Sequence, residues 1–321
     1  MEKLILILTD FTDTQKAMLE AAAPAHTFRY ENRKTVAKEL VASAEIIIGN
    51  PSLTMLPGAK NLKLLALSSA GANQYCEPGV LPEGVILTNA TGAFGTVIAE
   101  WLLGMLMNIY NRFPYYRENQ KKNLWESGPL PYTVFDSTVL IIGAGDIGSG
   151  FAKRVKALGG YTIGVRRTDA SKPDYFDEVY LTEAIDSLLP RADVVALALP
   201  STPETYHTID KKRLALMKED AVLLNVGRGT AIDTDALVNA LQAGKLMGVG
   251  LDVTDPEPLP ADHPLWQIEN AYITPHISGG SSFSGPKDFI TEVSAYNIKA
   301  ILSGTPLRNV VDVETGYRKL T

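Results

Sequence analysis

Three polar residues of this 321-residue chain follow apolar runs and could together carry out acid–base chemistry. Arg228 follows "LLNV", Glu257 follows "GLDVTDP" and His276 follows "YITP". A histidine exchanges protons near neutral pH, and a carboxylate can orient its imidazole and favour the charged form. An arginine fork can bind a carboxylate and a carbonyl oxygen together. Each residue alone also fits an ordinary role, as a loop histidine, an exposed turn glutamate or an arginine at a helix end.

A glycine-rich segment at 143–148, "GAGDIG", has the spacing of a phosphate-binding turn. An apolar run at 138–142 precedes it, a helical pattern follows it, and another apolar run lies at 161–165. This strand–turn–helix–strand context matches a dinucleotide-binding fingerprint, whereas the glycine spacing alone would be a weak signal.

The residues of this segment have separate predicted tasks. Gly143 permits the tight turn, Gly145 lets the backbone approach a pyrophosphate, and Gly148 lets the helix pack closely on the strand. The helix that begins near Asp146 and Ile147 points its N-terminus at the phosphates. All five residues are therefore predicted to bind the cofactor.

The second apolar run ends at Arg166, Arg167 and Thr168. NAD-binding versions of the motif carry an acidic residue at this point, about 20 residues after the glycines, to hold the ribose 2′-hydroxyl. Two guanidinium groups and a hydroxyl would instead bind a 2′-phosphate through charge-assisted hydrogen bonds. The sequence thus predicts NADP(H) as the preferred cofactor, with NAD(H) also accepted. The alternative is a solvated arginine pair with Asp169 as a surface partner.

Apolar runs alternate with helical patterns along the whole chain, which indicates parallel sheets covered on both faces. The apolar runs lie at 4–8, 46–49, 64–67, 85–88, 138–142, 161–165, 193–199, 221–226, 246–252 and 271–274. Helical patterns lie at 14–22, 33–42, 96–125 and 285–304, and the third of these contains only Gly104 and Pro114 as helix breakers.

We therefore predict an α/β protein with two doubly wound parallel-sheet domains. Residues 1–100 with 286–321 would form a flavodoxin-like substrate domain, and residues 101–285 a Rossmann dinucleotide-binding domain. The tail after the last helix has no strand series of its own, so it is expected to return to the first domain.

Composition narrows the classes of partner. A net charge of −6 argues against nucleic acid, and the apolar start "LILIL" is too short for a membrane span or signal peptide. A single cysteine, Cys76, excludes an intrachain disulfide and a multi-thiolate metal site. We expect a cytoplasmic protein with no metal, no membrane and no nucleic-acid partner.

Five motifs in order resemble the D-isomer-specific 2-hydroxyacid dehydrogenases: "GAGDIG", "LPRADVVALALPSTPETYHTID", "MKEDAVLLNVGRGTAID", "GLDVTDPEPLP" and "ITPHISGG". The similarity runs through nearly the whole chain. It implies that Arg228 binds the substrate carboxylate and polarises the 2-oxo group. His276 would give a proton to the carbonyl oxygen, and Glu257 would be its carboxylate partner.

The resemblance also implies roles for residues outside this triad. The backbone N–H groups of Ala70 and Gly71 would bind the substrate carboxylate, and Asp252 would hold the nicotinamide carboxamide. The remaining cofactor contacts would come from Leu199, Pro200, Thr205, Val226 and His276. Ala198 departs from the family pattern, which commonly has His or Asn there.

The predicted reaction is reduction of a small 2-oxo acid to its D-2-hydroxy acid by NADPH, or the reverse, in a homodimer. The missing acidic residue favours the glyoxylate/hydroxypyruvate reductase branch. One alternative is a nucleotide-sensing, corepressor-like binding module on the same fold. Another is oxidation of a different anion, such as formate or phosphite.

Overall fold

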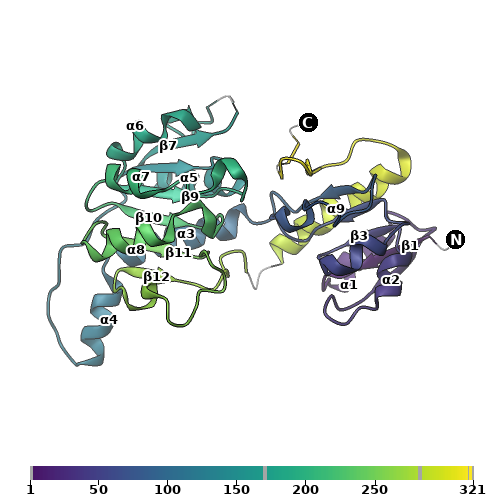
Figure 1. Cartoon of the computed structure of the whole chain (residues 1–321), viewed down its shortest axis with the longest axis horizontal. Coiled ribbons are helices and arrows are strands. Elements are labelled where there is room, and N and C mark those ends of the chain that lie inside the picture. Colours follow the sequence, from purple (N-terminus) through teal and green to yellow (C-terminus); the bar gives the residue numbers. More distant parts are fainter. Residues whose placement is uncertain (1–2, 169–171, 281–283, 317, 320–321) are drawn as a thin grey trace. The chain divides into compact units, whose positions relative to one another are not determined.

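A computed structural model describes residues 3–168, 172–280, 284–316 and 318–319 (Figure 1). Their contacts divide the chain into two compact units. Unit 1 comprises Met1–Phe94 with Ser281–Thr321, and unit 2 comprises Gly95–Gly280. These divisions fall ahead of two long helices, α3 (Gly95–Tyr110) and α9 (Gly285–Ser303), whereas the expected boundaries lay just inside them. A helix packs with one unit along its length, so the chain divides before its first turn.

The described part of unit 1 contains a five-stranded parallel sheet in the flavodoxin-like order β2-β1-β3-β4-β5. Its strands are β1 (Leu4–Ile7), β2 (Thr27–Tyr30), β3 (Ile46–Ile48), β4 (Leu64–Ala66) and β5 (Ile86–Thr88). Its α-helices are α1 (Asp13–Glu20), α2 (Lys38–Ser43) and α9. The C-terminal tail returns to this unit as predicted, and Val310 forms a bridge with Thr88 of β5.

Alternate residues of the unit 1 strands enter two separate cores, which explains why the strands are apolar throughout. Leu6 of β1 belongs to the core that contains Val41 of α2. Its neighbour Ile5 belongs to the opposite core, with Leu19 of α1 and Ile298 of α9. The prediction of a sheet covered on both faces is confirmed.

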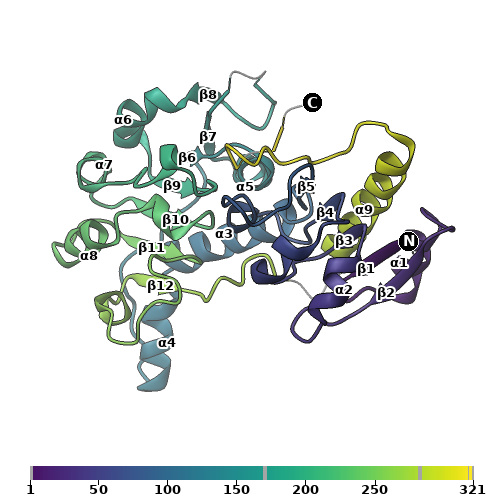
Figure 2. The ribbon, with the colours of Figure 1, turned by 45° about the vertical axis from the view of Figure 1, so that its right-hand side comes forward.

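The described part of unit 2 contains a seven-stranded parallel sheet in the order β12-β11-β10-β9-β6-β7-β8, which Figure 2 shows from β12 to β8. This is the Rossmann order with a seventh strand, and the order reverses between β6 and β9. The strands are β6 (Thr138–Ile142), β7 (Tyr161–Arg166), β8 (Glu178–Leu181), β9 (Val194–Leu197), β10 (Val222–Asn225), β11 (Gly248–Leu251) and β12 (Ala271–Ile273). The other α-helices are α4 (Phe113–Lys121), α5 (Asp146–Ala157), α6 (Ile185–Leu188), α7 (Lys211–Leu216) and α8 (Thr234–Gln242).

Several element predictions need correction. The edge strands β2 and β8 were not predicted, because their exposed outer side leaves them without a continuous apolar run. Gly104 does not interrupt α3, and the helical pattern instead breaks at Arg112, which has a left-handed φ of 55°. Residues 33–37 lie outside α2. Within the described ranges, no helix is long and apolar enough to cross a membrane.

Candidate active site

The predicted residues of unit 2 all lie at or beyond the C-terminal ends of its strands. Because neighbouring strands are parallel, these ends meet at one edge of the sheet, where open α/β sheets bind ligands. The loops are 143–148 after β6, 166–168 at the end of β7, 198–205 after β9, 226–229 after β10, 252–257 after β11 and 274–278 after β12.

The glycine loop, residues 143–148, has the geometry that its spacing predicts. Gly143 has a φ of 98°, and a Cβ there would lie 2.5 Å from the carbonyl oxygen of Ala198. A Cβ on Gly148 would lie 2.3 Å from the Gly143 oxygen, so helix and strand touch. A Cβ on Gly145 would meet no atom within 4 Å. That open space, at the N-terminus of the 12-residue helix α5, fits a diphosphate.

The other residues predicted to bind the cofactor line the same edge less directly. Ile147 is half-buried in the first turn of α5, and Val226 is buried at the end of β10. Leu199 packs against the core of unit 2. The Thr205 hydroxyl donates to the Pro200 oxygen over 2.7 Å, so it holds the turn after β9.

The end of β7 presents basic groups where an acid is usual. Arg166 is half-buried, and among the described residues its buried Nε has no hydrogen-bond acceptor. Arg167 and Thr168 are exposed. Asp169, the surface partner in the alternative interpretation, lies outside the described residues. A half-buried guanidinium at the expected ribose position fits a phosphate ligand.

Two glycines fix the backbone on both sides of Arg228. A Cβ on Gly227 would lie 2.5 Å from the Leu199 oxygen, and a Cβ on Gly229 would lie 1.9 Å from the Thr254 oxygen. Both positions therefore need glycine, because the loop after β10 passes directly between two neighbouring loops. This close packing sets where the arginine stands.

Sequence reasoning missed Asn225, which braces the same turn. Its fully buried side chain donates from Nδ2 to the Arg228 oxygen over 2.9 Å and accepts from the Gly227 N–H over 3.0 Å. The available signal was a polar residue inside an otherwise apolar run, because buried polar groups are normally hydrogen-bonded.

The Arg228 side chain is positioned by its own neighbour and is largely desolvated. Its Nη1 donates to the Gly227 oxygen over 2.6 Å. Burial lowers the pKa of Arg228, and the charge of the Glu257 carboxylate opposes that shift. The guanidinium stays charged, since arginine does not lose its proton in proteins, and its remaining donors are available to an anion.

His276 and Glu257 form the predicted pair. The Nδ1 of His276 lies 2.7 Å from Oε1 of Glu257. The two side chains are 47% and 41% exposed. With Nδ1 engaged by the carboxylate, Nε2 is the nitrogen that can exchange a proton with a ligand. His276 has a φ of 53°, which is uncommon outside glycine, and its N–H donates to the Asp252 oxygen over 2.9 Å.

Asp252 has a structural task that the sequence did not reveal. Its side chain is 1% exposed and accepts three hydrogen bonds from the loop that carries His276. The donors are Thr274 Oγ1 at 2.6 Å, the Ile277 N–H at 2.8 Å and the Ser278 N–H at 2.9 Å. Asp252 therefore ties the loops after β11 and β12 together, whatever it contributes to the cofactor.

In unit 1, the loop with Ala70 and Gly71 has its carbonyl groups occupied. Asn89 Nδ2 donates to the Ala70 oxygen over 2.7 Å, and Ser69 Oγ donates to the Gly71 oxygen over 2.8 Å. Asn50 in turn donates to Ser69 Oγ over 2.9 Å. Among the described residues, the N–H groups of Ala70 and Gly71 have no acceptor. The arrangement suits the predicted carboxylate binding, and both asparagines were missed.

A Rossmann sheet with a glycine loop, an arginine and a histidine–glutamate pair at its strand ends defines a dinucleotide-dependent oxidoreductase. Residues 103–278 match the family model of the "D-isomer specific 2-hydroxyacid dehydrogenase, NAD binding domain". The chain belongs to the D-isomer specific 2-hydroxyacid dehydrogenase family. It is an oxidoreductase of the 2-oxo acid reductase type, which confirms the predicted family, fold and enzyme class.

Individual relatives cover most of the chain. A glyoxylate/hydroxypyruvate reductase B from Pectobacterium carotovorum subsp. carotovorum (strain PC1) is 32% identical over 85% of this chain and 87% of its own. A crystal structure of a family protein from Aeromonas salmonicida subsp. salmonicida A449 is 33% identical, with a TM-score of 0.86 over 98% of this chain and 100% of that one. A family structure from Xanthobacter autotrophicus Py2 in complex with NADPH and MES is 26% identical, with a TM-score of 0.83 over 99% and 100%.

Proposed function

We propose that this enzyme reduces a small 2-oxo acid, of the glyoxylate or hydroxypyruvate class, to its D-2-hydroxy acid with NADPH as the favoured cofactor. The observation that carries the acid–base part is the 2.7 Å contact between His276 Nδ1 and Glu257 Oε1. The relative from Pectobacterium, named a glyoxylate/hydroxypyruvate reductase, supports this substrate class.

The cofactor would be held by the glycine loop and the end of β7. Gly143, Gly145 and Gly148 would bind its diphosphate at the N-terminus of α5, and Arg166 would bind its 2′-phosphate. When bound, the nicotinamide dinucleotide supplies a hydride for the carbonyl carbon. Asp252, with three hydrogen bonds to the 274–278 loop, would keep the site rigid around the nicotinamide.

The chain's own residues would orient and protonate the substrate. The remaining guanidinium donors of Arg228 would grip the carboxylate and the 2-oxo oxygen of the substrate together. The desolvated charge of Arg228 would stabilise the negative charge that develops on that oxygen. His276, held through Nδ1 by Glu257, would deliver its Nε2 proton to the same oxygen. In unit 1, the N–H groups of Ala70 and Gly71 would bind a carboxylate group.

The preference for NADPH rests on the end of β7. In the part of the chain that the structure describes, the buried Nε of Arg166 has no acceptor, and Arg167 and Thr168 are exposed. A 2′-phosphate would give the guanidinium a charged acceptor, while a ribose 2′-hydroxyl would find no carboxylate at positions 166–168. The solved relative from Xanthobacter, in complex with NADPH, supports this assignment.

The test is a kinetic screen with glyoxylate, hydroxypyruvate, pyruvate and longer 2-oxo acids, each with NADPH and with NADH. We expect turnover with the small acids and a lower KM for NADPH. Replacing Arg166 and Arg167 together by alanine should raise the KM for NADPH by about 10-fold or more, the value of a charge-assisted contact, and leave that for NADH nearly unchanged. No turnover with any acid would refute the reaction. An equal rise of KM for both cofactors would refute the NADPH assignment.

A further inference from the structure

Phe176 lies beneath the arginine that the proposed function assigns to the 2′-phosphate. We propose that Phe176 is a positioning residue for cofactor selection, which acts by holding the Arg166 guanidinium in place for that phosphate. The inference rests on the proposed preference for NADPH. It concerns the segment 172–177, between β7 and β8, which no sequence motif marked.

The contact between these two residues is an aromatic ring against a cation. Cζ of Arg166 lies 5.8 Å from the centre of the Phe176 ring, and the ring is fully buried. Within the described part of the chain, the buried Nε of Arg166 has no hydrogen-bond acceptor. The ring is therefore the contact that orients the guanidinium before a ligand arrives.

Gly164 shows that β7 is built around this ring. A Cβ at Gly164 would lie 2.9 Å from Cε1 of Phe176 and 3.0 Å from its Cδ1. Glycine weakens the interior of a strand, and it often marks a place where another group approaches closely. Here the approaching group is the Phe176 ring, two residues along the strand from Arg166.

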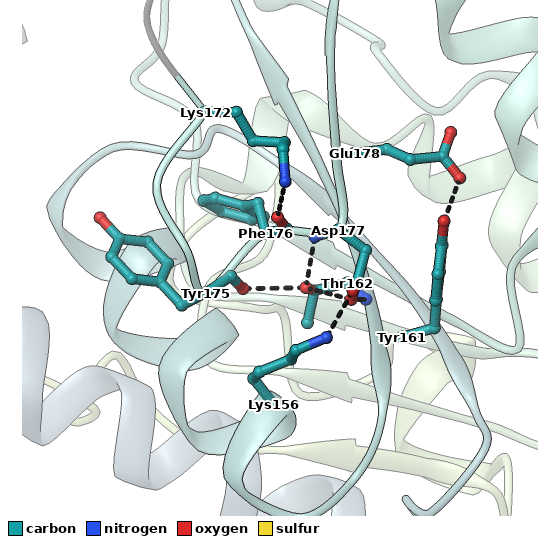
Figure 3. A network of polar contacts seen from close by, with 8 residues as sticks. All are labelled: Lys156, Tyr161, Thr162, Lys172, Tyr175, Phe176, Asp177 and Glu178. Carbon is teal, nitrogen blue, oxygen red and sulfur yellow. Dashed lines mark hydrogen bonds and ion pairs between the residues drawn. The ribbon is translucent and has the colours of Figure 1, made fainter.

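A hydrogen-bond network fixes the backbone on both sides of Phe176 (Figure 3). Thr162 Oγ1 donates to the Tyr175 oxygen over 2.8 Å, and the Asp177 N–H donates to the Thr162 oxygen over 2.9 Å. Lys172 Nζ donates to the Phe176 oxygen itself over 3.0 Å. Because three consecutive residues are tied in this way, the ring has little freedom to move away from Arg166.

The experiment measures binding without catalysis. Calorimetry would compare adenosine 2′,5′-bisphosphate, which carries the 2′-phosphate, with ADP, which lacks it, on the wild type and on Phe176→Leu. Loss of a partly desolvated cation–π contact should lower the affinity for the bisphosphate about 3- to 20-fold and change the affinity for ADP by less than about 2-fold. The KM for NADPH should rise by the same factor, with the KM for NADH unchanged.

Phe135→Leu is the matched control, because its ring lies beside Gly159, which precedes β7, whereas Arg166 is the last residue of that strand. This variant should leave both affinities unchanged. In an Arg166→Ala background, Phe176→Leu should have no further effect on the bisphosphate. A further loss there, or equal losses of bisphosphate and ADP, would show a general structural role and overturn the inference.

The outcomes separate this inference from the proposed function. If Arg166→Ala weakens both ligands equally, the NADPH assignment fails. If Arg166→Ala lowers the affinity for the bisphosphate only, and Phe176→Leu leaves that affinity unchanged, the role of Phe176 is refuted and the NADPH assignment stands. Should the leucine variant not fold, pentafluorophenylalanine at position 176 keeps the shape and reverses the ring's electrostatics. It should then weaken the bisphosphate alone, and an unchanged affinity would equally refute the inference.

Discussion

Replacing Asp252 by asparagine keeps the size of the side chain but removes its charge and one acceptor oxygen. In the native protein, the buried carboxylate binds Thr274 Oγ1 and the N–H groups of Ile277 and Ser278. These bonds hold the loop in which His276 takes a left-handed backbone. The substitution therefore tests whether Asp252 positions the proton donor.

The expected cost follows from the three bonds. An asparagine at position 252 can place its oxygen where Oδ1 accepts from Thr274 and Ile277. Its NH₂ group then faces the Ser278 N–H, which is left without an acceptor. A buried donor left unpaired costs about 1–3 kcal/mol, and bonds to a neutral oxygen are weaker than bonds to a charged one. We therefore expect the free energy of unfolding to fall by about 3 kcal/mol. Because the His276 loop loosens, kcat should fall as well.

Urea unfolding and steady-state kinetics check this prediction. The urea midpoint should fall by about 1 M for a loss of this size. Asp233→Asn is the control, since Asp233 caps α8 through the Ala236 N–H at 3.0 Å, and asparagine caps a helix about as well. The control should change neither stability nor kcat.

Two results would refute the reasoning about Asp252. An unchanged urea midpoint would mean that the three bonds do not hold the loop. An unchanged kcat with a raised KM for the cofactor would assign Asp252 to the nicotinamide carboxamide alone and remove its link to His276.

Exchanging His276 for glutamine should lower kcat by about 10²–10⁴-fold in steady-state assays, because an amide cannot transfer the proton. Gly229→Ala would place a Cβ 1.9 Å from the Thr254 oxygen, so we expect a loss of about 1–3 kcal/mol in urea unfolding. Hydrogen bonds from Arg191, Tyr180 and Tyr161 lower the pKa of Glu178 to about 2. The charged Glu178 carboxylate therefore stabilises the fold above pH ~4.3, the pKa of glutamate in the unfolded chain. This stabilisation is lost as the pH falls toward 2, the pKa in the folded protein. Glu178→Gln should cost less than about 1 kcal/mol at pH 7, and the urea midpoints of the wild type and the variant should converge as the pH is lowered toward 2.

A different result would contradict each of these predictions. Full activity of the His276 variant would remove the histidine from the proton-transfer step. For the glycine substitution, Gly58→Ala is the control, because a Cβ there meets no atom within 4 Å. Equal stability of the Gly58 and Gly229 variants would contradict the close packing of the two loops. If the urea midpoints of the wild type and the Glu178→Gln variant differed by the same amount at every pH, the ion pair with Arg191 could not be the cause of that difference in stability.

Local patterns in the sequence were enough to predict the two parallel sheets and the glycine loop. Buried strands such as β1 and β6 are apolar on both faces, and the glycine loop carries its own backbone requirement in its spacing. The edge strands β2 and β8 could not be predicted in this way, because none of their residues is fully buried and their residues follow no continuous apolar pattern.

The sequence by itself determined which residue types stand at the strand ends, including Arg228, Glu257 and His276. Only the tertiary structure decided how they are held, because the holding contacts join residues distant in the chain. Asp252 receives its hydrogen bonds from the 274–278 loop, Gly229 packs on Thr254, and Arg166 lies over Phe176. A one-dimensional pattern records the period of a helix or strand, but it does not record which side chain a neighbouring loop brings within hydrogen-bond distance.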